Sequence, residues 1–204
     1  MNDAHDLDQL RRNVSIHGHA TLPPYVRLAD IPQPWLDRFL EALVGSQAPV
    51  IEGEGQVAYE ADWALFLRRA ERRQRARHIA EILKYLPKDP SPDVLGAAPV
   101  LDPWFVVRDP SQGLCLRGAV LEHPRLPGVG QWIVTSMLIG INLEAGCART
   151  ASRWYRLGKM VAPAECEALR GAPSNPALAP VGIDEVTPWF ARLRTLLARE
   201  GFDV

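Results

Sequence analysis

Residues 104–157 read WFVVRDPSQGLCLRGAVLEHPRLPGVGQWIVTSMLIGINLEAGCARTASRWYRL, and this stretch decides the fold. Runs of branched and aromatic residues alternate here with turns rich in Gly, Pro, Asp and Asn, a pattern typical of short strands. Such strands, joined by tight turns, predict a small antiparallel β-barrel or a strongly curled sheet. Gly118, in the middle of a strand, fits the bend that a barrel requires. We expect five strands, at 105–108, 114–123, 131–142, 147–150 and 153–157.

Helices are predicted before this module. A short one is expected at 2–12, and a stronger pattern starts at Asp30, which can cap a helix with Pro32 and Pro34 in its first turn and Gly45 as its stop. Between this helix and the next, residues 49–56 indicate a short strand or extended loop. The buried stripe of the helix would consist of Trp35, Leu36, Phe39, Leu40 and Leu43.

A second helical pattern runs over 60–86, but its apolar stripe jumps. Trp63 and Leu67 point to nearly the opposite side from Ile79 and Leu83 on a straight helix. Two interpretations stay open: a break near 70–76, or one helix that packs against different neighbours at its two ends. The Pro- and Asp-rich segment 88–99 is the best candidate for a linker.

After the β module we expect a short helix at 163–170 and a last helix capped by Thr187, with a buried stripe of Trp189, Phe190, Leu193, Leu196 and Leu197. The fold class is therefore α+β: a helical N-terminal half, a small antiparallel five-stranded barrel-like module and a C-terminal helix. The expected regions are 1–99, 100–160 and 161–204, which could form one composite domain.

Composition narrows the class of protein. Apolar residues make up 47% of the 204 residues, which is enough for a packed core, and no apolar run approaches the length of a membrane span. The polar N-terminus does not resemble a signal peptide. Three cysteines are an odd number without metal-type spacing, so a disulfide framework is not expected. We expect a cytoplasmic protein without a cofactor.

Charge is segregated although the net charge is only −1. Residues 1–60 are acidic, whereas residues 61–159 carry an excess of bases, most of them Arg. Arg suits planar recognition of carboxylate and phosphate groups. The abundance of Arg, Ala and Pro also fits a GC-rich genome with no functional meaning.

Two arginine-rich segments are candidate binding surfaces. The first lies in the helix 60–86 and can engage phosphates or an acidic protein surface; the alternative is a solvated helix face paired with the acidic N-terminal region. The arginines of this first segment are Arg68, Arg69, Arg72, Arg73, Arg75 and Arg77.

The second segment interleaves arginines with aromatics on the last strand of the module. Such a strand can hold single-stranded nucleic acid by charge and stacking, or form the centre of a protein interface. Alternatively, Trp154 and Tyr155 point to opposite faces and one of them belongs to the core. The residues are Arg149, Arg153, Trp154, Tyr155 and Arg156.

Other sites are weaker. The carboxylates Glu52, Glu54, Glu60 and Asp62 could form an acidic surface, bind a divalent ion or act in acid–base chemistry. His17 and His19 form an alternating pair without a nearby acid or Cys to complete a metal site. His123, Thr135 and Ser136 resemble a catalytic triad by residue type alone. Cys115 and Cys147 lie in strand patterns, as small core residues do.

No nucleophile elbow, phosphate loop, dinucleotide fingerprint or zinc-protease motif occurs. We therefore expect no catalytic residues, no metal and no enzyme activity.

A longer pattern carries a resemblance: Gly118, His123-Pro124, Gly130, Thr135-Ser136, Ala148-Arg149-Thr150, Ser152-Arg153, Tyr155 and Leu157-Gly158. Together with DIPQPW at 30–35 and GQVAYEADW at 55–63, it resembles uncharacterised accessory proteins of proteobacterial plasmids and integrative elements. The resemblance covers most of residues 30–158 and brings no catalytic residues. It implies an accessory gene of a mobile element, a group that includes anti-CRISPR proteins and other inhibitors of host defence, and regulators of transfer.

Two functions follow as expectations. The first is a non-enzymatic binding protein of a mobile genetic element that engages a host protein or ribonucleoprotein complex and inhibits host defence. The second is a small β-barrel protein that binds nucleic acid or has a regulatory role. A metal-dependent enzyme built on the four carboxylates is a third reading. The sequence leaves the partner and the oligomeric state open.

Overall fold

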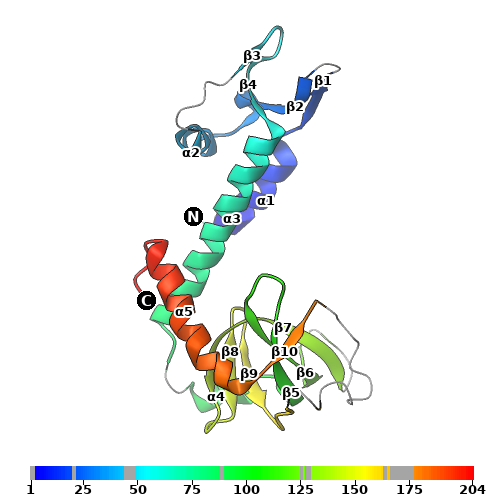
Figure 1. The fold of residues 1–204 in the computed structure, drawn as a ribbon, viewed down its shortest axis with the longest axis vertical. Helices are drawn as coiled ribbons and strands as arrows, with labels where there is room; N and C mark the ends of the chain where they lie inside the picture. The colour runs from blue at the N-terminus through cyan, green and yellow to red at the C-terminus, as the bar shows by residue number, and fades with distance from the viewer. Residues whose placement is uncertain are drawn as a thin grey trace. The chain divides into compact units, whose positions relative to one another are not determined.

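A computed structural model describes residues 3–19, 22–43, 49–87, 90–124, 126, 130–162, 165 and 177–204. The chain divides into two units, Met1–Arg77 and His78–Val204. The β module and the C-terminal helix both fall in the second unit (Figure 1). Among the described helices, none is long and apolar enough to cross a membrane.

The first unit contains a sheet as well as helices, so the prediction of a mostly helical N-terminal half is wrong. Four short strands pair antiparallel in the order β1-β2-β4-β3. The elements are α1 (Asp3–Asn13), β1 (His17–His19), β2 (Leu22–Arg27), the 3₁₀ turn η1 (Leu28–Asp30), α2 (Trp35–Ala42), β3 (Val50–Ile51), β4 (Gly55–Tyr59) and the start of α3 (Glu60–Lys84).

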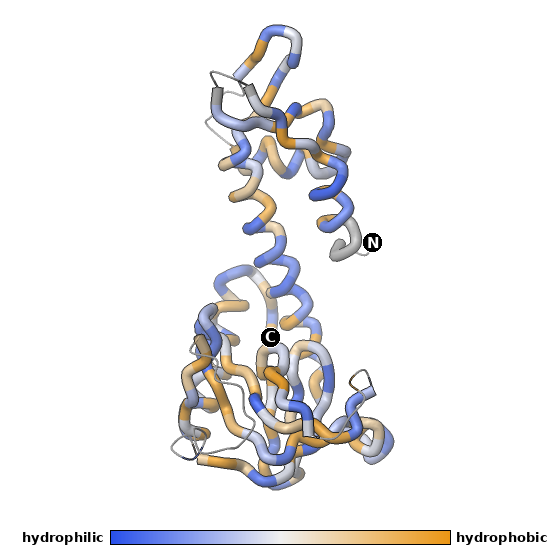
Figure 2. The backbone as a smooth tube through the Cα atoms, turned by 90° about the vertical axis from the view of Figure 1, so that its right-hand side faces the viewer, coloured by the Kyte–Doolittle hydropathy of each residue, from blue (hydrophilic) through white to orange (hydrophobic). Residues whose placement is uncertain are grey.

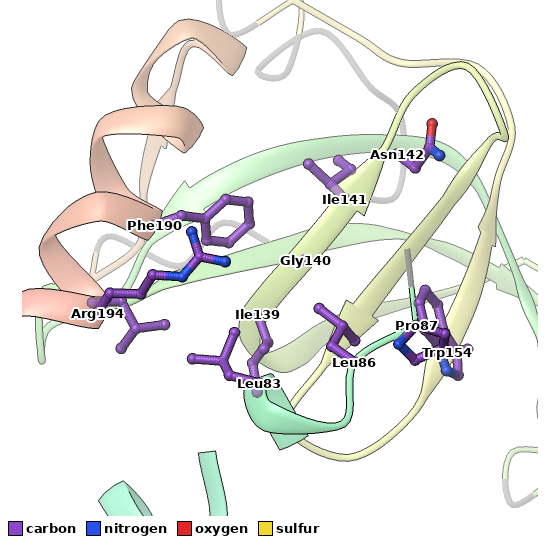
Figure 3. A pocket seen from close by; sticks show the side chains of 11 residues that line it. Leu83, Leu86, Pro87, Ile139, Gly140, Ile141, Asn142, Trp154, Phe190 and Arg194 are labelled. Carbon is purple, nitrogen blue, oxygen red and sulfur yellow. The ribbon is translucent and has the colours of Figure 1, made fainter. Parts of the chain in front are cut away.

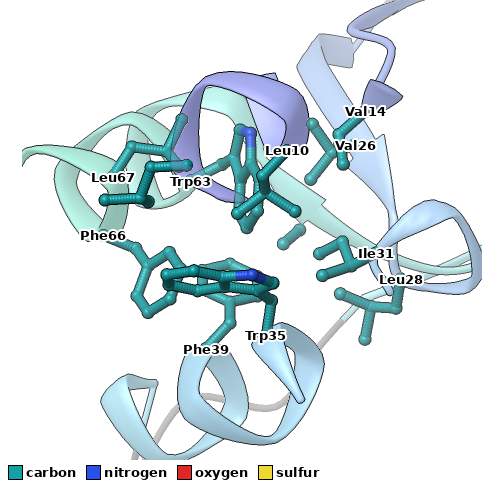
Figure 4. Packing of buried hydrophobic residues seen from close by; sticks show 12 residues of the cluster. Leu10, Val14, Val26, Leu28, Ile31, Trp35, Phe39, Trp63, Phe66 and Leu67 are labelled. Carbon is teal, nitrogen blue, oxygen red and sulfur yellow. The ribbon is translucent and has the colours of Figure 1, made fainter. Parts of the chain in front are cut away.

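The core of the first unit is built around aromatic rings (Figure 4). Phe39 of α2 is fully buried, and its ring centroid lies 5.1 Å from that of Trp63 and 5.2 Å from that of Phe66. The same cluster contains Leu10 of α1, Val14 directly after that helix, and Val26 of β2. The helices and the sheet of this unit therefore share one core.

Two details of the predicted α2 helix are wrong. The helix begins at Trp35, and Asp30 lies in the preceding 3₁₀ turn, where its carboxylate accepts from Arg27 Nε at 2.9 Å instead of capping α2. Leu40, expected in the buried stripe, is exposed. Trp35 and Phe39 are buried as expected.

Helix α3 is continuous over its 25 residues, so no break occurs near 70–76. Trp63, Phe66 and Leu67 are buried in the first unit, whereas Ile79 and Ala80 are buried residues of the second. The second interpretation is confirmed: the stripe jumps because the two ends of one helix belong to different cores. The stretch between them is hydrophilic along the tube in Figure 2.

The second unit holds the predicted barrel, closed by five strands in chain order. They are β5 (Val100–Arg108), β6 (Leu114–Leu121), β7 (Gln131–Asn142), β8 (Cys147–Thr150) and β9 (Trp154–Leu157). Neighbours along the chain pair antiparallel, but β9 closes the barrel on β5 in parallel, through Val100↔Arg156 and Leu101↔Leu157. The barrel is therefore mixed and not antiparallel. With an odd number of strands that alternate in direction, the first and last must run the same way.

The pairing of β5 with β6 is irregular near the start of β5, between Leu101 and Trp104. A Cβ added to Gly118, which pairs with Trp104, would lie 2.6 Å from the carbonyl oxygen of Pro103. The backbones approach so closely that only glycine fits there. Beyond this point the free edge of β5 pairs with β10 (Ala179–Val181).

The C-terminal helix is confirmed as α5 (Val186–Arg199), preceded by the 3₁₀ turn η3 (Ile183–Glu185). It begins before Thr187, so Thr187 is not its cap. Its Trp189 Nε1 donates to the carbonyl oxygen of Leu138 at 3.3 Å, where the β7–β8 pairing shifts register and frees that carbonyl. Leu196, expected in the stripe, is exposed.

The short helix α4 (Pro92–Gly96) lies within the segment 88–99 that was expected as a linker. The expected helix at 163–170 falls outside the described residues, apart from position 165.

Candidate functional site

The six arginines of the first candidate surface are all exposed on α3. An α-helix turns about 100° and rises about 1.5 Å per residue, so they form two rows. Arg69, Arg73 and Arg77 follow one another at intervals of four residues, about 6 Å apart along the axis. The other row lies on average about a third of a turn away, and its members are Arg68, Arg72 and Arg75.

The row of Arg69, Arg73 and Arg77 borders a cavity of about 450 Å³ in the first unit. Arg38 of α2 lines the same cavity from the other helix. We call this site the arginine groove, defined by Arg38, Arg69, Arg73 and Arg77. Its apolar wall consists of Leu7, Trp35, Ala42, Phe66 and Ala70.

The groove is strongly cationic. Among the lining residues that the structure describes, Glu41 is the one carboxylate, against four guanidinium groups. The Arg38 guanidinium lies over the Trp35 ring, 5.0 Å from its centroid, which fixes that charge on an apolar platform. Glu71 of α3 is not available to neutralise the groove from within, because it forms an ion pair with Arg11 at 2.5 Å.

The structure separates the members of the second candidate surface. Tyr155 is 3% exposed and belongs to the barrel core, which raises the pKa of its hydroxyl. Arg156 donates from Nε to the carbonyl oxygen of Ala98 at 3.0 Å and pairs with Glu122 at 2.6 Å. The alternative considered for this strand, with the two aromatics on opposite faces, is the arrangement observed.

Two members of that surface remain together. Arg149 and Trp154 are opposite each other in the β8–β9 ladder and are both partly exposed. Burial lowers the pKa of Arg149. Arg153 is also partly exposed, and the loop around it is held by Thr150, whose Oγ donates to the Arg153 carbonyl oxygen at 3.2 Å. This patch holds two arginines, Arg149 and Arg153, whereas four arginines line the arginine groove.

The four carboxylates do not form one site. Glu52 is exposed in the turn between β3 and β4, and Glu60 and Asp62 lie in the first turn of α3. Glu54 faces Arg27, whose Nη1 lies 3.6 Å from its Oε2. Within the described part of the chain, no group of three or more His, Cys, Asp or Glu side chains is placed to hold a metal ion.

The weaker sites take structural roles where their contacts are defined. His17 stacks on Tyr25 and lies 3.4 Å from the Asp30 carboxylate; the hydrogen bond from Arg27 is the main cause that lowers the pKa of Asp30. Thr135 Oγ1 accepts from the Leu116 N–H at 2.9 Å, where the β6–β7 register shifts. The side chain of His19 lies outside the described residues.

The cysteines Cys115 and Cys147 are buried and unbridged, as expected of small core residues. Burial, with a smaller contribution from Asp109, raises the pKa of the Cys115 thiol to about 12. A thiol with such a pKa is almost entirely protonated at neutral pH and is a poor nucleophile.

Sequence reasoning found the arginines of α3 but missed Arg38 and Trp35 as parts of the same site. They come from a different helix, and their position depends on how α2 packs on α3 through Phe39 and Phe66. No local pattern in the sequence carries that information.

The fold and the groove define an α+β protein with a closed five-stranded mixed barrel and a separate cationic site. The model of DUF6634, a family of unknown function, matches residues 77–194. This is more than half of the chain, so the protein belongs to that family. Searches of curated proteins and of solved structures give no match. The matched region contains the barrel and most of α5, whereas the arginine groove lies outside it except for Arg77.

Proposed function

We propose that the protein is a non-enzymatic binding protein that engages nucleic acid, free or within a nucleoprotein complex, through the arginine groove. The observation that carries the proposal is that four guanidinium groups from two helices line one cavity, with a single carboxylate among the described lining residues. Repeated Arg contacts to phosphate groups supply most of the affinity of sequence-independent nucleic-acid binding.

The spacing of the charges supports a polymeric anion as the ligand. Arg69 and Arg73 are about 6 Å apart along the axis of α3, and Arg38 faces the same cavity from α2. A row of regularly spaced cations matches a chain of phosphates better than it matches one isolated anion. Arg guanidinium groups also bind phosphate through two parallel hydrogen bonds, which Lys cannot do.

The apolar wall favours a single strand over a duplex. Unstacked bases can pack against apolar surface and against the planes of Arg side chains. The Arg38 guanidinium, which lies over the Trp35 ring, offers such a plane beside the groove. A duplex would present phosphates alone to this site and leave the apolar wall unused.

For the physiological target we propose a host nucleoprotein complex, following the resemblance to accessory proteins of mobile elements. Inhibition of a host defence system would be the consequence. Expression of the protein in a strain with an active CRISPR–Cas system tests this: we expect plasmid interference to fall with the intact groove and to be retained with R69Q/R73Q. Equal plasmid interference with and without the protein would contradict a CRISPR–Cas complex as the target.

Binding itself is tested with a 5′-fluorescein-labelled single-stranded RNA of about 15 nucleotides, measured by fluorescence anisotropy at low salt. Poly-L-glutamate with the same number of charges serves as the competitor. We expect the RNA to bind and the polypeptide to compete poorly, because it offers carboxylates without bases. Equal competition would assign the groove to an acidic protein surface instead, and absence of RNA binding would refute the proposal.

A further inference from the structure

A second pocket, of about 310 Å³, lies in the second unit between the end of α3, strand β7 and helix α5 (Figure 3). It shares no residue with the arginine groove. Small-molecule sites in proteins are concave, mostly apolar and start at about this volume. The apolar part of the lining is formed by Leu83, Leu86, Ile139, Ile141, Phe190 and Leu193.

Gly140 helps to keep this space open. A Cβ at this position would lie 3.0 Å from Leu86 Cδ2, which is tighter than an ordinary van der Waals contact. A larger residue would therefore displace Leu86 or occupy the pocket. With glycine in β7, Leu86 packs directly over the strand backbone and the remaining volume stays empty of side chains.

Arg194 is the one charged residue among the described residues that line the pocket. Figure 3 shows Arg194 reaching from α5 along the Phe190 ring toward the cavity, with Trp154 on the opposite side. Among the lining residues that the structure describes, none carries a carboxylate. The pocket thus combines the guanidinium of Arg194 and the amide of Asn142 with an apolar wall, and Trp154 lies on the side away from Arg194.

We propose that this pocket binds a small hydrophobic carboxylate. The carboxylate would pair with Arg194, and an aromatic or branched apolar body would fill the space between Leu86, Ile141 and Phe190. Arg is the side chain that matches a carboxylate in two parallel hydrogen bonds. A volume equal to about ten waters accommodates about a dozen non-hydrogen atoms.

The inference is independent of the nucleic-acid proposal. All residues that line the pocket fall between 83 and 194, inside the region that the family model matches. The ligand would therefore bind to the barrel unit whether or not the groove of the first unit binds nucleic acid.

The test compares 4-phenylbutyrate with its uncharged counterpart 4-phenylbutan-1-ol, by chemical-shift titration of the full-length ¹⁵N-labelled protein. We expect the acid to shift the indole signal of Trp154 and backbone signals of β7 and α5, and to bind at least about fivefold more tightly than the alcohol, the gain of a charge-assisted hydrogen bond at an exposed site. R194Q should lose that advantage.

R192Q is the matched control, because Arg192 is an exposed arginine of the same helix that does not line the pocket. It should bind the acid as the parent protein does. Three results overturn the proposal: no saturable shifts with about 10 mM acid, equal affinity for acid and alcohol in the parent protein, or equal loss of affinity in R192Q and R194Q. Circular dichroism of each variant excludes unfolding as the cause.

Discussion

Replacement of two arginines in the groove should flatten the salt dependence of nucleic-acid binding. In the double variant R69Q/R73Q, two charges are removed from one row of α3 while helix-forming side chains of similar length remain. Neither residue is buried, so the fold should be unaffected. The perturbation therefore acts on the charges that face the cavity.

The magnitude follows from the number of cations. We expect Arg38, Arg69 and Arg73 to contact phosphates, whereas Arg77 engages in another interaction within the protein. Each neutralised phosphate of a single strand contributes about −0.7 to the slope of log K against log salt, so three give about −2.1. Between 50 and 200 mM salt, affinity should then fall about 18-fold in the parent and only about 2.6-fold in R69Q/R73Q.

The assay is anisotropy with the labelled RNA across that salt range, and R68Q/R72Q is the control. Its two arginines have the same four-residue spacing on the same helix but belong to the row away from the cavity. The control should keep a slope close to that of the parent. If both double variants flatten the slope equally, the helix binds as a uniform rod of charge and the groove has no special role.

Three further predictions concern the cores and the thiols. Phe39→Ala should lower the free energy of unfolding of the first unit by about 3–5 kcal/mol, because it removes a fully buried ring. Amide hydrogen exchange should show lost protection in the first unit but not in the barrel, and a uniform loss of protection would contradict separate cores. Trp189→Phe should cost about 1–3 kcal/mol in urea unfolding because the carbonyl of Leu138 loses its donor; an unchanged midpoint would show that this hydrogen bond contributes nothing. In a C166S variant at pH 8, the folded protein should resist iodoacetamide, whereas the unfolded protein should react at two thiols. The reason is that the pKa of the Cys115 thiol is raised to about 12 in the folded protein, so the reactive thiolate forms only as the pH approaches that value. Rapid labelling of the folded protein would refute this prediction.

The barrel could be predicted because its signals are local. Alternation and glycine-containing turns placed the strand at 131–142 and the strand at 147–150 where the structure has them. Closure of the barrel joins strands that are far apart in the sequence. The parallel pairing of β5 with β9 nevertheless follows once five strands of alternating direction are known. The sequence left open whether Tyr155 is buried or exposed, because alternation alone does not say which face of a strand is the interior.

Most of the sheet of the first unit was missed for a different reason, although a short strand or extended loop was expected at 49–56, where β3 and the start of β4 lie. Its strands are two to six residues long, and β2 contains Pro23 and Pro24, which are typical of loops. Such strands are stable only because β2 pairs with β4, more than thirty residues later in the chain. The arginine groove was missed in the same way, since Arg38 and Arg73 line one cavity only after α2 packs on α3.

The most direct test of the central claim is a map of where the RNA binds. In ¹H–¹⁵N spectra of the full-length protein titrated with the 15-nucleotide strand at low salt, we predict that the shifted amides concentrate in 35–42 and 66–77. Signals of β8 and β9 should remain in place. Shifts confined to the barrel strands, with α2 and α3 unchanged, would contradict the account.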